Sequence, residues 1–177
     1  MTSGRASGSA AVSDRHEPDP TRIVADSDVL VADLLVGGPS RDVMDVLRSH
    51  SWLEPIATEP LLAAAEAVIA SLADATLAGE WRATAEDLLS VVEQPAGDRP
   101  ALAAAYRGNA SQIVTLDDRL RSASTGANLR GLFEVSVRSP EAFLSVVDPE
   151  PLYELAFDAS YPGPDRPRRR RDGGDRR

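Results

Sequence analysis

Two aspartates stand two residues apart near the start of the chain, directly after a short apolar run. The run is Ile23 and Val24, and Asp26 and Asp28 follow it. This order predicts a buried strand that carries a carboxylate at its C-terminal end, where ligands and catalytic groups collect in open α/β sheets. Two carboxylates at such an edge can bind a hard divalent cation through their oxygen atoms. The alternative is that Ser27 or Asp28 only caps the next helix, a role that both residue types favour.

A second apolar run that ends in aspartates lies further along the chain. It comprises residues 113–115, and Asp117 and Asp118 follow it. Because parallel strands end at the same edge of a sheet, Asp26 and Asp117 are expected to lie close together. This coincidence favours a functional site over helix capping alone.

The remaining pattern predicts the elements that position these acids. Short apolar runs alternate with segments of helical period, which is typical of an α/β fold with a parallel sheet of four to five strands flanked by helices. Pro55 predicts an edge position or a short strand, and Gly79 predicts a helix break. The expected strands are 22–25, 53–57, 113–115 and 133–137, and the expected helices are 28–35, 40–49, 58–75, 80–93, 101–107, 116–122 and 139–147.

Composition excludes several classes of protein. The 177 residues include no cysteine, so disulfides, thiolate metal sites and cysteine nucleophiles are ruled out. No apolar run approaches the roughly 20 residues of a membrane span, and the first residues lack the apolar region of a signal peptide. The two glycines before Pro39 have no lysine to complete a phosphate-binding loop. We therefore expect a cytoplasmic protein with no membrane partner.

Charge and composition divide the chain into three parts. Residues 1–20 are predicted to be a disordered arm, in which His16 has no role, residues 21–157 a folded domain, and residues 158–177 a disordered arginine-rich tail. The net charge is −9, yet residues 165–177 hold seven arginines and three aspartates. The tail either contacts RNA phosphates or remains solvated and offsets the acidic body.

Three motifs follow one another along the chain: Asp26-Ser27-Asp28-Val29-Leu30, Ile113-Val114-Thr115-Leu116-Asp117 and Ser139-Pro140-Glu141-Ala142-Phe143-Leu144. In this order they resemble the motifs of a PIN domain, the nuclease fold of toxin-type and processing ribonucleases. The resemblance covers about residues 22–147 and implies a three-layer α/β/α domain. The acidic composition, in which every basic residue other than histidine is arginine, resembles that of salt-adapted archaeal proteins.

The resemblance implies a metal-dependent phosphodiesterase. Asp26, Asp98 and Asp117 correspond to the acids that would act in catalysis and hold Mg²⁺ or Mn²⁺, and Asp28 is a further candidate ligand. The expected substrate is RNA. The expected partners include a second copy of the chain, as a homodimer, or a small antitoxin-type protein.

Two positions depart from the PIN pattern. Ala64 stands where the family has a glutamate, and Arg119 stands where it often has an acid. Because affinity for hard cations depends on the number of charged ligands, the loss weakens the expected site. Two hypotheses follow: a divalent-metal-dependent endoribonuclease with a reduced carboxylate site, or a catalytically inactive PIN-like module that acts in RNA or protein binding.

Overall fold

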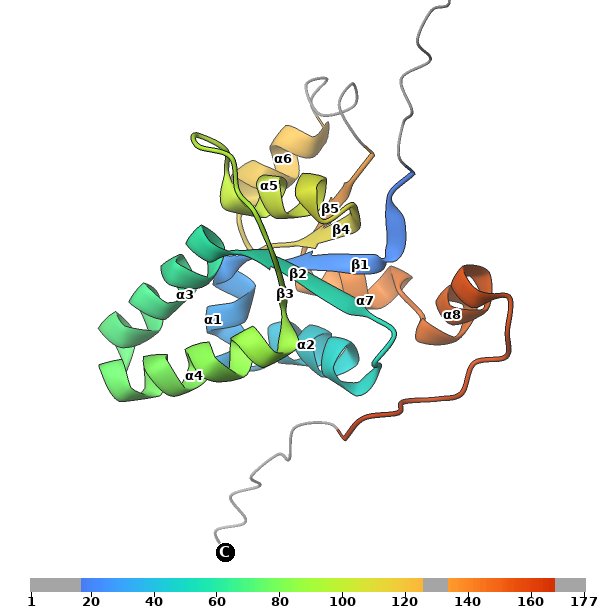
Figure 1. Cartoon of the computed structure of the whole chain (residues 1–177), viewed down its shortest axis with the longest axis horizontal. Helices are drawn as coiled ribbons and strands as arrows, with labels where there is room; N and C mark the ends of the chain where they lie inside the picture. Colours follow the sequence, from blue (N-terminus) through green and yellow to red (C-terminus); the bar gives the residue numbers. More distant parts are fainter. Residues whose placement is uncertain (1–16, 126–133, 168–177) are drawn as a thin grey trace, which may run out of the picture.

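A computed structural model describes residues 17–125 and 134–167 (Figure 1). Its five strands form one sheet in the order β3-β2-β1-β4-β5, and every neighbouring pair is parallel. This confirms the predicted α/β class with a parallel sheet flanked by helices. The strands are β1 (Asp19–Ala25), β2 (Glu54–Thr58), β3 (Ser90–Val92), β4 (Ala110–Val114) and β5 (Ser136–Arg138).

The helices cover both faces of the sheet. In Figure 1, α1 to α4 and α7 lie below it, α5 and α6 lie above it, and α8 lies beside β1. None of the helices in the described ranges is long and apolar enough to cross a membrane. The helices are α1 (Ser27–Leu35), α2 (Pro39–Ser49), α3 (Glu59–Leu72), α4 (Ala75–Leu88), α5 (Pro100–Arg107), α6 (Asp118–Thr125), α7 (Pro140–Val146) and α8 (Pro149–Phe157).

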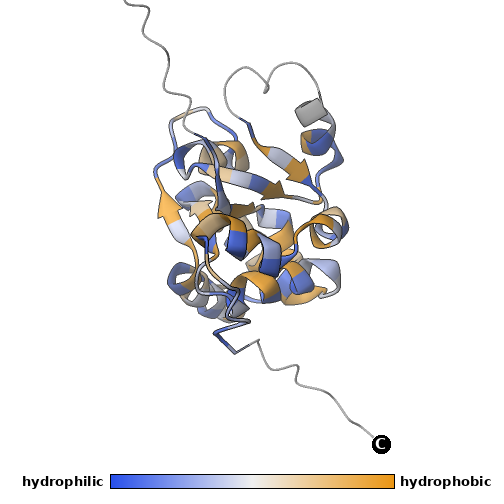
Figure 2. Ribbon diagram, turned by 90° about the vertical axis from the view of Figure 1, so that its right-hand side faces the viewer, coloured by the Kyte–Doolittle hydropathy of each residue, from blue (hydrophilic) through white to orange (hydrophobic). Residues whose placement is uncertain are grey.

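The core lies against the central strand β1. Ile23, Val24 and Ala25 are at most 1% exposed, because helices cover both faces of the strand. The sequence of β1 is therefore continuously apolar at its end, as expected for a parallel strand buried on both faces. Figure 2 shows that the strands and the neighbouring helix turns are largely hydrophobic.

The structure corrects the prediction that Gly79 ends a helix. Gly79 lies inside α4, which begins earlier because the Asp74 side chain accepts a hydrogen bond of 2.9 Å from the backbone N–H of Leu77. A single glycine inside a helix costs only about 1 kcal/mol, less than the packing of α4 returns. The predicted helix over 80–93 therefore ends at Leu88, and β3 takes the residues that follow.

The edge position predicted from Pro55 is wrong as well. β2 lies between β1 and β3, and Pro55 pairs with Ile23 of β1. The ladder to β3 begins only at Ile56, which pairs with Ser90. Pro55 thus stands near the first residue of its strand, where a missing N–H is tolerated.

Residues 158–167, assigned above to the tail, lie against the body of the domain. The Tyr161 hydroxyl lies 2.6 Å from Nε2 of His50, and the Asp165 carboxylate accepts hydrogen bonds from Ser51. The backbone N–H groups of Asp165 and Arg166 both donate to the carbonyl of Ser49. The chain is therefore held to the end of α2 as far as Pro167. The predicted arm up to residue 16, with His16, and the tail beyond Pro167 lie outside the described residues.

Candidate functional site

Asp26 stands where β1 meets α1, at the carboxyl edge of the sheet. Its backbone N–H donates to the carbonyl of Val114, which extends the β1–β4 ladder by one bond of 2.9 Å. It is also the N-cap of α1, and its Oδ1 accepts a hydrogen bond of 2.7 Å from the N–H of Ser27. Asp26 is therefore both a strand-end acid and a cap. The alternative drawn from the sequence, in which Ser27 or Asp28 is the cap, is therefore wrong about the residue, because the cap is Asp26 itself.

Thr115 connects Asp26 to Asp28. Its side chain is fully buried after β4, and its Oγ1 lies 3.0 Å from Oδ2 of Asp26 and 3.3 Å from Oδ2 of Asp28. A hydroxyl has one hydrogen to donate, so it serves one carboxylate at a time. The N–H of Leu116 donates to the same oxygen of Asp28 at 3.1 Å. The other oxygen of Asp28, Oδ1, is buried and has no hydrogen-bond partner among the described residues.

Burial and neighbouring negative charge raise the pKa of Asp26 and of Asp28. Burial raises the pKa of Asp26 most, and the charge of Asp28 adds to it, while the Ser27 N–H and the Thr115 hydroxyl act in the opposite direction. Burial also raises the pKa of Asp28, and the negative charge of Asp117 raises it further. The ionised pair is therefore under electrostatic strain, which a bound cation would relieve.

Asp117 lies near this pair but is turned toward its own helix. Its N–H donates to Oγ1 of Thr115 at 3.1 Å, and its Oδ1 accepts a hydrogen bond of 2.8 Å from the N–H of Arg119. The side chain is exposed. The structure thus brings Asp26, Asp28 and Asp117 to one edge, and it directs the third carboxylate to α6.

The structure does not bring Asp98 to these acids. Asp98 is exposed in the turn before α5, and the contacts found for it among the described residues are backbone ones, to Gln94 and Pro95. Gln94 accepts a hydrogen bond of 2.8 Å from the Thr58 hydroxyl, so the turn is tied to the end of β2 instead. The expected convergence of Asp26, Asp98 and Asp117 is therefore not seen for Asp98.

The acids of α3 are engaged elsewhere. Ala64 is exposed, and no carboxylate extends from that position of the helix. Glu59 and Glu66 both pair with Arg82 of α4, Glu66 at 3.6 Å. Arg82 also holds Glu86 at 2.7 Å. This cluster joins α3 to α4. Both acids of α3 are thus engaged with Arg82, and neither is left to join Asp26 and Asp28 at the carboxyl edge of the sheet.

A hard cation takes several oxygen ligands. No group of three or more histidine, aspartate or glutamate side chains in the described ranges is arranged to hold a metal ion. Asp26 and Asp28 nevertheless fit such an ion in part, because they face one hydroxyl and Asp28 has a buried oxygen without a donor. The edge is a two-carboxylate site with a third acid nearby.

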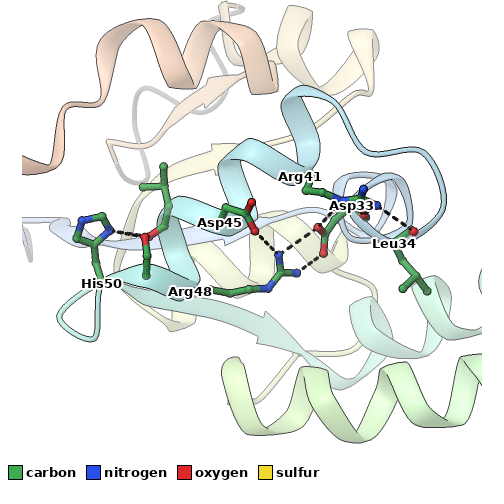
Figure 3. A network of polar contacts seen from close by, with 8 residues as sticks. Asp33, Leu34, Arg41, Asp45, Arg48 and His50 are labelled. Carbon is green, nitrogen blue, oxygen red and sulfur yellow. Dashed lines mark hydrogen bonds and ion pairs between the residues drawn. The ribbon is translucent and has the colours of Figure 1, made fainter. Parts of the chain in front are cut away.

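Sequence reasoning gave Thr115 no role of its own and did not mention Asp33. Thr115 links the acids, and its position between a strand and an aspartate was a usable signal. Asp33, at the other end of α1, is 1% exposed and pairs with Arg48 of α2 (Figure 3). A single acid in an amphipathic helix gives no sign in the sequence that it is buried.

The chain belongs to a family of unknown function, DUF7384, whose model matches residues 17–169. The match takes in all five strands and the segment held to α2. A comparison with curated proteins finds no match, and neither does a comparison with solved structures.

Proposed function

We propose that this DUF7384 protein is a PIN-like endoribonuclease with a reduced carboxylate site that depends on Mg²⁺ or Mn²⁺. The proposal rests on one observation: Asp26 after β1 and Asp28 in the first turn of α1 meet at the Thr115 hydroxyl, and Oδ1 of Asp28 is buried without a donor among the described residues. A buried anionic oxygen without a partner is costly, so such an atom in a folded protein calls for an explanation. A divalent cation supplies one.

Each residue at the edge has a distinct part in this proposal. Asp26 and Asp28 would hold the cation, and Asp117 would contribute through water or after turning from the Arg119 N–H. Thr115 keeps the two carboxylates in place while they are ionised. A divalent cation bound there would lower the pKa of a water molecule and stabilise negative charge on a phosphodiester.

The order of the sheet and the three motifs support a PIN-like fold for this proposal. The central strand comes first in the chain, and the acids follow β1 and β4, which are neighbours. Both acidic segments therefore reach the same edge, as the motifs imply.

A second candidate is a catalytically inactive PIN-like module that acts in RNA or protein binding. Three observations favour it: Asp98 is exposed and points to no other acid, Asp117 bonds to its own helix, and α3 offers Ala64 in place of an acid. Hydrolysis of a phosphodiester by a two-carboxylate site would be slow, because fewer ligands leave the cation more weakly held.

Calorimetric titration with Mn²⁺ tests the site, in buffers of low and of molar salt. We expect binding to the wild type and a loss of affinity of about tenfold or more in Asp28→Asn, which removes a charged ligand. Glu154→Gln is the matched control, because Glu154 is exposed on α8 and far from the edge in sequence and fold. Absence of Mn²⁺ binding to the wild type would contradict the metal site.

Cleavage of a fluorogenic RNA, with Mn²⁺ and with a chelator, then separates the two candidates. Mn²⁺-dependent cleavage that Asp28→Asn abolishes and Glu154→Gln retains supports the ribonuclease. Binding of Mn²⁺ without cleavage supports the inactive module.

A further inference from the structure

A groove lies between α1, α2 and α4, on the side of the sheet opposite α5. Its volume is about 540 Å³. Its wall is mainly apolar, with Leu30 and Leu34 from α1 and Leu77, Trp81 and Leu88 from α4. The Asp33–Arg48 pair of Figure 3 is among its lining residues and joins α1 to α2.

One rim of the groove is acidic. Glu80 and Asp87 line it together with Thr84, and these residues recur at the spacing of one face of α4. Both acidic side chains are exposed, and among the described residues neither forms an ion pair. By contrast, the neighbouring acid of α4, Glu86, pairs with Arg82. The rim thus offers two free carboxylates beside an apolar wall.

The C-terminal segment reaches this groove. Arg166 and Pro167 are among its lining residues, and the contacts of Tyr161 and Asp165 hold the preceding chain to the end of α2. In Figure 1 the described segment ends below α2. The last described residue, Pro167, thus lies at the groove, and the sequence continues with four arginines, Arg168 to Arg171.

We propose that residues 168–177 of this chain occupy the groove, with their arginines on the acidic rim. The segment holds six arginines and two aspartates, a net charge of +4, which is opposite in sign to the two carboxylates of the rim. Arginine stems cover apolar surface while the guanidinium groups remain at the polar rim.

The lengths agree with this arrangement. Glu80 and Asp87 are seven residues apart in a helix, which is about 10 Å at 1.5 Å per residue. Four extended residues span about 13 Å. Four extended residues after Pro167, which lines the same groove, are therefore long enough to cover the separation of the two acids.

Attachment to the same chain strengthens this contact. A short tether gives the segment an effective concentration in the millimolar range, so individually weak ion pairs suffice. The groove would then be closed to outside basic or apolar peptides in the intact chain.

The absence of cysteine in the chain allows a direct test by paramagnetic NMR. A nitroxide attached to Thr84→Cys would lie in the groove and broaden amide signals within its range. We expect loss of intensity in the amides of residues 168–177. The same label at Ser145→Cys on α7 is the control and should leave these amides unchanged.

Charge variants check the cause of the contact. Glu80→Gln combined with Asp87→Asn should restore the intensities, as should molar salt, because both weaken the ion pairs. Glu141→Gln combined with Glu154→Gln changes the net charge equally and should restore nothing. Unbroadened amides of 168–177 in the intact chain at low salt would overturn the proposal.

A mixing experiment distinguishes the chain's own segment from that of a second copy. Spin-labelled protein without ¹⁵N is mixed with ¹⁵N-labelled protein without the spin label. We expect no broadening in this mixture. Broadening only in the mixture would overturn the proposal and assign the groove to a second copy.

Discussion

The carboxylates at the two ends of α1 have opposite electrostatic surroundings. At its C-terminal end, Asp33 is 1% exposed and pairs with Arg48. Arg41 donates to the carbonyls of Asp33 and Leu34, and Asp45 holds Arg48 from the side (Figure 3). Every charge in this cluster meets an opposite charge or a backbone carbonyl.

At the N-terminal end, Asp26 and Asp28 lie beside a third acid, Asp117, and no arginine pairs with them among the described residues. Neutral donors hold them, and one oxygen of Asp28 has no donor. The first cluster fixes helix packing and needs no ligand. In the second cluster the ionised carboxylates repel one another, and a bound cation would remove this repulsion. The presence or absence of a compensating charge therefore distinguishes a structural acid from a candidate functional one.

The largest expected effect follows from breaking the first cluster. Arg48→Ala leaves Asp33 buried without its main partner and should lower the free energy of unfolding by about 3–5 kcal/mol. Urea denaturation measures it. Arg107→Ala, at an exposed arginine, should cost about 0.5 kcal/mol or less. Equal losses in the two variants would show that the pair has no special structural role.

Thr115→Val should have an intermediate effect. It removes the hydroxyl that lies between Asp26 and Asp28 and keeps the shape of the side chain, so we expect a loss of about 1–2 kcal/mol. Thr76→Val, at an exposed position of α4, is the control, and it should change the free energy of unfolding by about 0.5 kcal/mol or less. A stability equal to that of the wild type would mean that the hydroxyl supports neither carboxylate.

The smallest effect has the opposite sign. The pKa of Asp28 is raised in the folded state, so its ionisation destabilises the fold. Asp28→Asn should therefore raise the free energy of unfolding near pH 7 by about 0.5–1 kcal/mol. The gain should shrink as the pH falls through the folded-state pKa and vanish below about pH 4, where the carboxyl is protonated in both states.

Thermal unfolding from pH 3.5 to pH 7.5 measures this difference, with pH values on both sides of the ordinary aspartate pKa. Asp33→Asn on the same helix should instead lower stability near pH 7, since it weakens the pair with Arg48. If both variants shifted stability in the same direction, the contrast between the two ends of α1 would not hold.

The sequence predicted the strand-end position of Asp26 and Asp117 because both follow β-branched runs that end abruptly. It missed β3, because Val92 continues the helical period of Trp81, Ala85 and Leu88, and three residues are too few to show a strand period. The pairing of Ser90–Val92 with β2 is a tertiary contact that outweighs local pattern.

The burial of Asp33 and the direction of Asp98 could not be read from the sequence for a related reason. Burial of Asp33 depends on Arg48, fifteen residues away on another helix. The turn that carries Asp98 is directed by Gln94, which bonds to Thr58, 36 residues earlier. Residue type and spacing predict which element a side chain lies on, and the packing of distant elements decides what it meets.

The position of β1 also determines when the acidic edge can form during synthesis. β1 is near the start of the chain, yet its neighbour β4 is made much later, and Thr115 lies 89 residues after Asp26. Closing so long a loop delays folding, since its entropy is lost before the contact forms. While the ribosome makes residues 30–110, Asp26 and Asp28 remain apart from Thr115 and Asp117. A chain released before β4 is complete would contain the first two acids and no site.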